Sequence, residues 1–203
     1  MIEEKARQSL ENNSRYFSPF LGEPRRDGDG FVFSTEGLPL AGFRVRYDIE
    51  RKFLGRIYVM GLEGSFSSGE ISPAPGRRGE PETRSGRPQE IELRYSGFLR
   101  KGRARFVSLP SRKDRDEGGG VVPLLNGDSV LIEQCRGLEV EFLRIFFDGE
   151  SWKVRVRPYG GSFIKVLLPP LQYHVPLGKE QAERILSVMK TIAGLIVRKG
   201  PES

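Results

Sequence analysis

The last segment of the chain constrains the fold more than any other feature. Residues 182–197 place apolar side chains on most of the circumference of a helix rather than on one narrow stripe. Such a helix must be covered on most of its sides, and no run of about 18 apolar residues that could span a bilayer is present. In a chain otherwise rich in strand patterns, the cover can only be a sheet. The segment therefore predicts a buried C-terminal helix packed on a β-sheet.

Most of the chain before this helix alternates apolar and polar residues with a period of two. Gly, Pro and Asp bound the alternating runs, which is typical of antiparallel strands. A short amphipathic helix over residues 2–17 precedes them. The sequence therefore predicts an α+β fold, with a mostly antiparallel β-sheet or barrel wrapped on the C-terminal helix and a short N-terminal helix. Strands are expected at 31–33, 41–50, 53–62, 91–98, 102–109, 129–134, 138–147, 152–158, 162–168 and 171–176.

Local signals add detail to one hairpin of this sheet. Asp148-Gly149 separates two alternating runs and predicts a hairpin turn. Within the first run the parity of the apolar residues changes between Val140 and Leu143, which indicates a β-bulge. With that bulge, Glu141 faces Arg157 across the hairpin, and the two side chains are expected to form a cross-strand ion pair.

Two stretches interrupt the strand pattern. In residues 64–90, 14 of 27 residues are Gly, Pro or Ser, so little apolar material offsets the entropy of ordering. Residues 110–120 have a similar character. Both are predicted to be mobile insertions. Because the strands on either side need each other to bury one face, residues 1–203 are expected to form a single domain.

Charge and composition exclude several classes of protein. Thirty-three Lys and Arg against 27 Asp and Glu give a net charge of +6, which favours weak attraction to polyanions at low salt. One Cys and one His exclude a disulfide framework and a Cys/His zinc site, and no cofactor or metal is expected. The first 20 residues lack an apolar core and a cleavage site for secretion, so a cytoplasmic location is expected.

Catalytic motifs are sparse. Cys135 and His174 are the one candidate pair of nucleophile and base. However, Cys135 follows a predicted strand and His174 is expected to face solvent, so a strand-end thiol and a surface imidazole are the favoured interpretation. No G-x-S-x-G elbow and no Walker Lys-Ser/Thr pair is present. An enzyme is therefore the least favoured class of function.

Basic side chains recur at alternate positions of several predicted strands. If these strands share one face of the sheet, that face is a cationic platform that binds phosphates without sequence specificity. Residues 101–107 approach the RNA-recognition consensus, but Arg stands where aromatic stacking residues are needed. The alternative is an ordinary solvated face with interspersed acidic side chains. The candidate ligand-binding residues are Arg44, Arg46, Arg103, Arg105, Lys153, Arg155 and Arg157.

A second hypothesis starts from the core. A curved sheet around a C-terminal helix can leave an apolar cavity for a lipid-like ligand, although a filled core is the alternative. The helix is apolar nearly all round and the basic strands lack stacking aromatics. We therefore favour a non-enzymatic binding or scaffold protein for an apolar or lipid-like ligand. Non-specific binding of a polyanion or nucleic acid through the basic face is the second choice, and an apolar ligand or an anionic surface is the expected partner.

Four segments resemble a small uncharacterised bacterial family of unknown function: residues 43–55 (FRVRYDIERKFLG), 158–162 (PYGGS), 168–171 (LPPL) and the final helix. The resemblance covers most of the chain. Its motifs consist of turn and strand residues, so it implies a bacterial origin and no particular activity. In outline, a strand-rich chain that ends in an apolar helix is also similar to tubby-like and scramblase-like barrels. That second similarity concerns shape alone.

Overall fold

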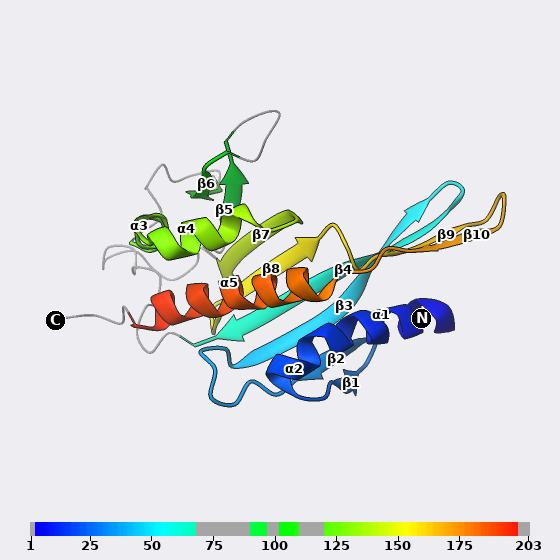
Figure 1. Ribbon diagram of the computed structural model, residues 1–203, viewed down its shortest axis with the longest axis horizontal. Helices are drawn as coiled ribbons and strands as arrows, with labels where there is room; N and C mark the ends of the chain where they lie inside the picture. The colour runs from blue at the N-terminus through cyan, green and yellow to red at the C-terminus, as the bar shows by residue number, and fades with distance from the viewer. Residues whose placement is uncertain (1–2, 68–89, 97–101, 110–119, 199–203) are drawn as a thin grey trace, which may run out of the picture.

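The computed structural model describes residues 3–67, 90–96, 102–109 and 120–198. Within them, antiparallel pairing joins ten strands into one open sheet (Figure 1). The predicted α+β fold is confirmed, in its sheet form rather than as a barrel. The strands are β1 (Arg25–Asp27), β2 (Gly30–Phe33), β3 (Gly42–Lys52), β4 (Gly55–Phe66), β5 (Glu90–Tyr95), β6 (Ala104–Ser108), β7 (Val140–Phe147), β8 (Trp152–Pro158), β9 (Phe163–Val166) and β10 (Leu171–His174).

The described helices gather on one face of this sheet, which we term the inner face (Figure 1). The opposite face, which no described helix covers, is the outer face. The N-terminal and C-terminal helices predicted from the sequence are both present. The helices are α1 (Glu4–Ser14), the 3-10 turn η1 (Arg15–Phe17), α2 (Ser18–Leu21), α3 (Val121–Gly127), α4 (Ser129–Arg136) and α5 (Lys179–Arg198).

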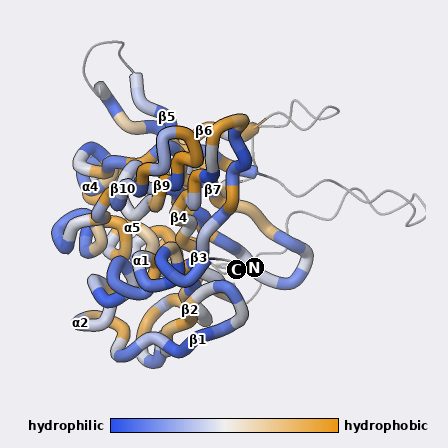
Figure 2. Tube along the Cα trace, turned by 90° about the vertical axis from the view of Figure 1, so that its right-hand side faces the viewer, coloured by the Kyte–Doolittle hydropathy of each residue, from blue (hydrophilic) through white to orange (hydrophobic). Residues whose placement is uncertain are grey.

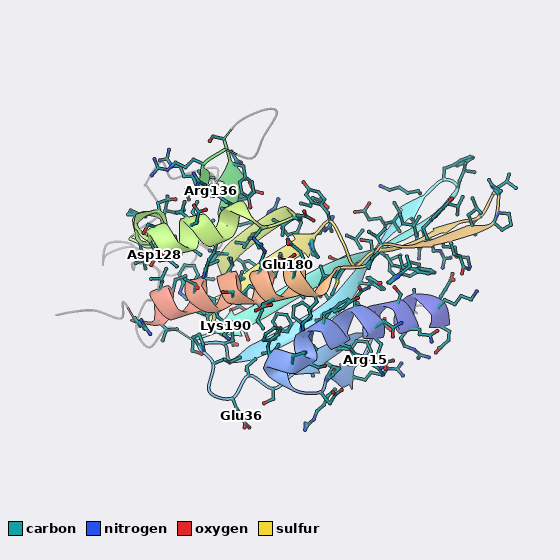
Figure 3. The ribbon with its side chains drawn as sticks, viewed as in Figure 1. Arg15, Glu36, Asp128, Arg136, Glu180 and Lys190 are labelled. Atoms are coloured by element: carbon teal, nitrogen blue, oxygen red, sulfur yellow. The ribbon has the colours of Figure 1, made fainter. Side chains whose placement is uncertain are left out.

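Strand β4 connects the body of the sheet to a projecting part. The strands follow the order β1-β2-β3-β4-β8-β7-β5-β6. Along one edge, β4 pairs with β9 through residues 55–58 and with β8 through residues 62–66. Because β10 pairs with β9, the β3–β4 and β9–β10 hairpins leave the body side by side. They form an arm that projects well beyond α5 (Figures 1 and 3).

Helix α5 packs closely on the inner face. Gly64 of β4 lies under it, since a Cβ at this position would be 2.8 Å from Met189 Cε. Hydrophobic segments lie largely on the central strands and hydrophilic ones on the turns around them (Figure 2). Burying each apolar side chain of the helix contributes about 1.5–3 kcal/mol. The buried residues of α5 are Ala182, Ile185, Leu186, Val188, Met189, Ile192, Ala193 and Ile196.

The cover of α5 differs from the prediction in one respect. The sheet is not the only part of the protein that covers the helix, because η1, α3 and α4 also contact it. One side of the helix stays in solvent, with Glu183, Arg184 and Val197 exposed. Neighbouring helices therefore satisfy part of the apolar circumference that the sequence analysis assigned to the sheet.

Residues 129–134 form most of helix α4, so the strand predicted there is wrong. The Asp128 carboxylate accepts the Leu131 N–H at 2.7 Å and caps the first turn of the helix. Asp128 and Arg136 mark its two ends (Figure 3). Val130, one of the residues that suggested alternation, is exposed, whereas Leu131 is fully buried. Helix α3 and strand β1 were not predicted.

The predicted β7–β8 hairpin is confirmed. Asp148 and Gly149 lie in the turn between the two strands. The register shifts between Val140 and Phe142, where the β-bulge was expected. As a result, the outward-facing residues of β7 change parity along the strand, in agreement with the sequence pattern.

Most of the two predicted insertions, 64–90 and 110–120, lies outside the described residues. Their expected mobility therefore stays a prediction. Their boundaries need correction. Gly64 to Phe66 belong to β4, and Phe66 is 1% exposed. The Gly, Pro and Ser content of the segment suggested a loop there, but Gly64 packs closely against Met189 of α5. The buried apolar side chains of the described residues form one cluster, and the single domain stays a prediction.

Candidate functional site

The predicted basic residues all have the parity of the outer face. In one row across the sheet, Arg44 lies opposite Glu63, Glu63 opposite Arg155, and Arg155 opposite Arg144. Arg105 of β6 has the same parity, and Arg103 directly precedes that strand. The register therefore brings the candidate residues onto one surface, and it also places carboxylates between them.

Carboxylates pair with most of these cations. The Arg155 guanidinium donates two hydrogen bonds to Glu63 Oε2, at 2.8 and 3.1 Å. The pKa of Asp148 is held well below its usual range by the hydrogen bond from Lys153 and by backbone N–H groups of the turn. The ion pairs of the candidate residues are Arg44–Asp27, Arg46–Asp48, Lys153–Asp148, Arg155–Glu63, Arg157–Asp48, Arg157–Glu50 and Arg157–Glu141.

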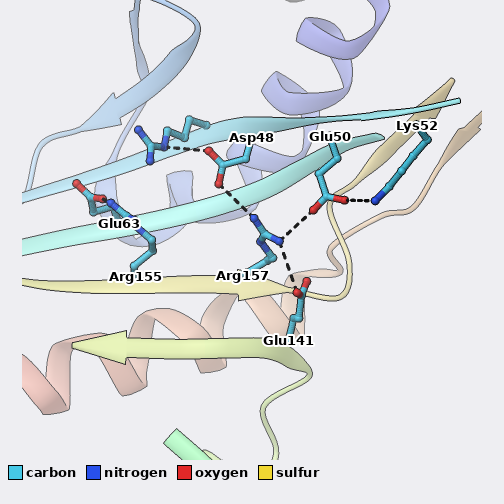
Figure 4. A network of polar contacts seen from close by, with 8 residues as sticks. Asp48, Glu50, Lys52, Glu63, Glu141, Arg155 and Arg157 are labelled. Carbon is cyan, nitrogen blue, oxygen red and sulfur yellow. Dashed lines mark hydrogen bonds and ion pairs between the residues drawn. The ribbon is translucent and has the colours of Figure 1, made fainter. Parts of the chain in front are cut away.

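Arg157 is the centre of the densest part of this network (Figure 4). Its side chain is only 18% exposed, and its guanidinium lies 3.2–3.6 Å from oxygens of Asp48, Glu50 and Glu141. The guanidinium also stands 5.2 Å from the centre of the Phe142 ring. The contact with Glu141 confirms the predicted cross-strand ion pair. Three carboxylates around one cation leave no positive charge there for an external anion.

This arrangement favours the solvated-face interpretation over a cationic platform. A phosphate that bound at Arg44, Arg46, Lys153, Arg155 or Arg157 would have to displace a carboxylate that already forms an ion pair with that side chain. Arg103 and Arg105 differ, since both are exposed and form no ion pair within the described residues. Among the candidate residues that the structure describes, uncompensated positive charge is therefore found at the β6 end of the outer face.

Cys135 and His174 do not form a catalytic pair. Cys135 is fully buried in α4 rather than at a strand end, and burial raises the pKa of its thiol to about 12. His174 is exposed on β10, as expected, and its Nε2 lies 3.2 Å from the Asn13 amide nitrogen. The thiol therefore has no neighbouring imidazole that could generate a thiolate at neutral pH.

Cys135 is expected to resist thiol reagents in the folded protein. With a pKa near 12, only about one thiol in ten thousand is ionised at pH 8, and the sulfur is shielded as well. Ellman's reagent should release colour slowly from the native chain, and one equivalent at once in guanidinium. Rapid stoichiometric reaction of the native protein would contradict the burial of this residue.

Exposed apolar side chains gather at the tip of the arm. Two turns contribute them, the β3–β4 turn and the β9–β10 turn. The Leu167 N–H donates to the Leu54 carbonyl at 2.8 Å and holds the turns together. We term the following residues the apolar tip, with the exposed fraction of each in parentheses: Phe53 (98%), Leu54 (49%), Leu167 (56%), Leu168 (71%) and Leu171 (43%).

A glycine allows the two turns to meet. A Cβ at Gly55 would lie 2.2 Å from the Lys165 carbonyl oxygen, so a larger residue there would push the hairpins apart. Sequence reasoning missed the tip because it placed residues 53 and 54 at the start of one strand and residues 167 and 168 at the end of another. The turn signals Gly55 and Pro169-Pro170 were the information that could have located it.

Basic side chains surround the apolar tip. Lys52 pairs with Glu50 at 2.9 Å, and Lys165 pairs with Glu3 at 2.9 Å. The hydrogen bond from Lys165 is the main reason that the pKa of Glu3 lies below its usual value. Arg56 also approaches Glu3, whereas Arg51 is exposed and has no ion pair within the described residues. Four basic side chains face two carboxylates, which leaves an excess of positive charge.

Two further features are absent from the described residues. These residues contain no group of three or more His, Cys, Asp or Glu side chains arranged to hold a metal ion. None of the helices in this part of the chain combines the length and the apolar character needed to cross a bilayer.

Together, fold and surface define an α+β protein whose open antiparallel sheet carries helices on one face and a projecting arm with an apolar tip. Comparison with known families places it more narrowly. The chain belongs to the family described as "Protein of unknown function (DUF3156)", whose model matches residues 15–196. The expected membership of a family of unknown function is thus confirmed, and it assigns no activity. No curated protein and no solved structure matches the chain.

Proposed function

We propose that this protein is a non-enzymatic binding protein whose apolar tip inserts into the surface of an anionic lipid bilayer. The observation that carries the proposal is the apolar tip itself. Five large apolar side chains from two turns stand 43–98% exposed at the end of a projecting arm. Contiguous exposed apolar side chains rimmed by charge are typical of protein or membrane interaction sites. The excess of positive charge around this tip favours an anionic bilayer as the partner.

The expected strength of insertion fits reversible binding. Full burial of Phe53 and Leu168 contributes about 3–6 kcal/mol together. Each Lys or Arg near an anionic membrane adds about 1 kcal/mol, and the exposed Arg51 and Lys52 are placed to do so. Apolar insertion and electrostatic attraction therefore act together to give membrane binding that is measurable and reversible.

The packing of the core favours an apolar partner at the protein surface over an apolar ligand enclosed between helix and sheet. Gly64 and Met189 bring β4 and α5 into direct contact, so side chains occupy the space expected for a ligand between helix and sheet. Leu62, Val154 and Ile192 of the same layer are fully buried. We therefore place the apolar partner of this protein at the end of the arm.

Sedimentation with vesicles tests this function. Wild-type protein should bind vesicles of phosphatidylcholine and phosphatidylserine more tightly than vesicles of phosphatidylcholine alone. Changing both Phe53→Ser and Leu168→Ser should weaken binding about 100-fold or more, because two inserted side chains are lost. The matched control is Val130→Ser, which removes a 63% exposed apolar side chain from α4 and should leave binding unchanged.

Charge at the tip is tested separately. Changing Arg51→Gln and Lys52→Gln should remove most of the preference for phosphatidylserine while weak binding to neutral vesicles remains. Circular dichroism should show that all variants are folded, since the altered side chains are exposed. The proposal is wrong if wild-type protein binds neither kind of vesicle. It is also wrong if the tip variants lose self-association rather than vesicle binding.

A further inference from the structure

A second surface feature lies far along the sheet from the arm, at the end of the β5–β6 hairpin. It is a groove of about 510 Å³, a size within the range of small-molecule sites. The groove wraps around edge strand β6, so both faces of the hairpin contribute to it. Its lining residues of interest are Arg94, Tyr95, Arg103, Arg105, Val107 and Ile132.

Three arginines line this groove, and two of them form no ion pair within the described residues. Arg94 lies directly opposite Arg105 in the β5–β6 register, and Arg103 is two positions further along. Like charges directly opposite each other destabilise a strand pair. Arg94 pairs with Glu92 at 3.1 Å, whereas Arg103 and Arg105 have no carboxylate partner in the part of the chain that the structure describes. The hairpin therefore holds a repulsive arrangement that an external anion would relieve.

The other polar groups of the groove are already used. Ser96 Oγ accepts the Arg103 N–H at 2.9 Å and donates to the Arg103 carbonyl at 3.3 Å. The Asn126 side-chain amide accepts the Phe106 N–H and donates to the Phe106 carbonyl, at 2.8 and 2.9 Å. The guanidinium groups are thus the donors that remain for a ligand.

Apolar side chains form the rest of the wall. Val107 and Ile132 line the groove and are partly exposed. A ligand that satisfies both parts carries one anionic end and an apolar body. Neither a bare polyanion nor a neutral lipid matches the two parts together.

We propose that the groove binds a small amphiphilic anion, a carboxylate or phosphate monoester attached to a short apolar group. The anionic end lies between Arg103 and Arg105, whose planar guanidinium groups suit such oxygens. The apolar body lies against Val107 and Ile132. This site is independent of the apolar tip, because no residue is shared between them.

Calorimetric titration tests the site with defined probes. Octanoate and octyl phosphate should bind wild-type protein, and their relative affinity distinguishes a carboxylate from a phosphate ligand. Octyltrimethylammonium, which carries the opposite charge, should not bind. Arg105→Gln and Arg103→Gln should each weaken binding about 10- to 100-fold, as expected for loss of a charged hydrogen bond. Arg25→Gln, an exposed arginine on edge strand β1, is the matched control and should bind normally.

Thermal unfolding supplies a second readout. Without ligand, Arg105→Gln should raise the melting temperature because it removes the like-charge pair. Inorganic phosphate should raise the melting temperature of wild-type protein and have little effect on the variant. The proposal is overturned if no anion binds, if the cation binds as well as the anions, or if Arg25→Gln weakens binding equally. Equal affinity for inorganic phosphate and octyl phosphate would show that the apolar side chains of the groove do not contribute to binding, which contradicts that part of the proposal.

Discussion

Ile192→Asp is expected to leave the chain unfolded. Ile192 lies at the middle of the buried face of α5 and is fully buried. No Lys or Arg is buried among the described residues, so a carboxylate there has no buried cation to pair with, and an unpaired buried charge costs several kcal/mol beyond the lost apolar contacts. We expect a loss of about 5 kcal/mol or more, which equals or exceeds the low end of the stability of a typical domain.

Circular dichroism and urea unfolding measure this effect. The matched control is Val197→Asp, which introduces the same side chain on the same helix at a 37% exposed position. This control should lose no more than about 1 kcal/mol, mainly from the helix dipole near the C-terminus. Cooperative unfolding of Ile192→Asp at wild-type urea concentrations would show that α5 is not part of the core.

Asn13→Ala is expected to destabilise the protein by about 2–4 kcal/mol, because buried polar groups lose their partners. Asn13 is 1% exposed. Its amide nitrogen donates to the Ser9 carbonyl at 3.0 Å and the Gly161 carbonyl at 3.4 Å. Its carbonyl oxygen accepts the Leu177 N–H at 3.1 Å. One side chain therefore joins α1 to the β8–β9 junction and to the segment that enters α5.

The neighbouring residue provides the control for this prediction. Asn12→Ala makes the same chemical change at an exposed position of the same helix, so its free energy of unfolding should stay within about 0.5 kcal/mol of wild type. Equal unfolding free energies for the Asn13 and Asn12 variants would contradict the bridging role of Asn13. Chemical denaturation followed by the fluorescence of the buried Trp152 is a suitable measurement.

Local patterns predicted most strands but could not always separate strand from helix. Asp148-Gly149 and the parity change after Val140 are decided by neighbouring residues, so the hairpin and its bulge were predictable. In residues 129–134, four to six alternating residues suit a strand as well as one side of a helix. Asp128, which can cap a helix at its N-terminus, is the signal that distinguishes them.

The surface was harder to predict than the fold, because it depends on register. Alternation showed that Arg44, Arg155 and Arg105 could share a face. It could not show that Glu63 from another strand would lie between Arg44 and Arg155, since that requires the pairing of three strands. The apolar tip was missed for a similar reason. Phe53 and Leu168 look like strand residues until the two hairpin ends are located.

The amide of Asn126 has a consequence for how copies of this chain behave toward each other. It pairs with both backbone groups of Phe106 on the free side of β6, as another strand would. An edge strand with unpaired N–H and C=O groups is a template for joining sheets of separate molecules. At the other end of the sheet, β1 is three residues long and all of them are exposed and charged. Both ends of the main sheet are thus protected against edge-to-edge aggregation, one by a side chain that imitates a strand and the other by a short, charged strand.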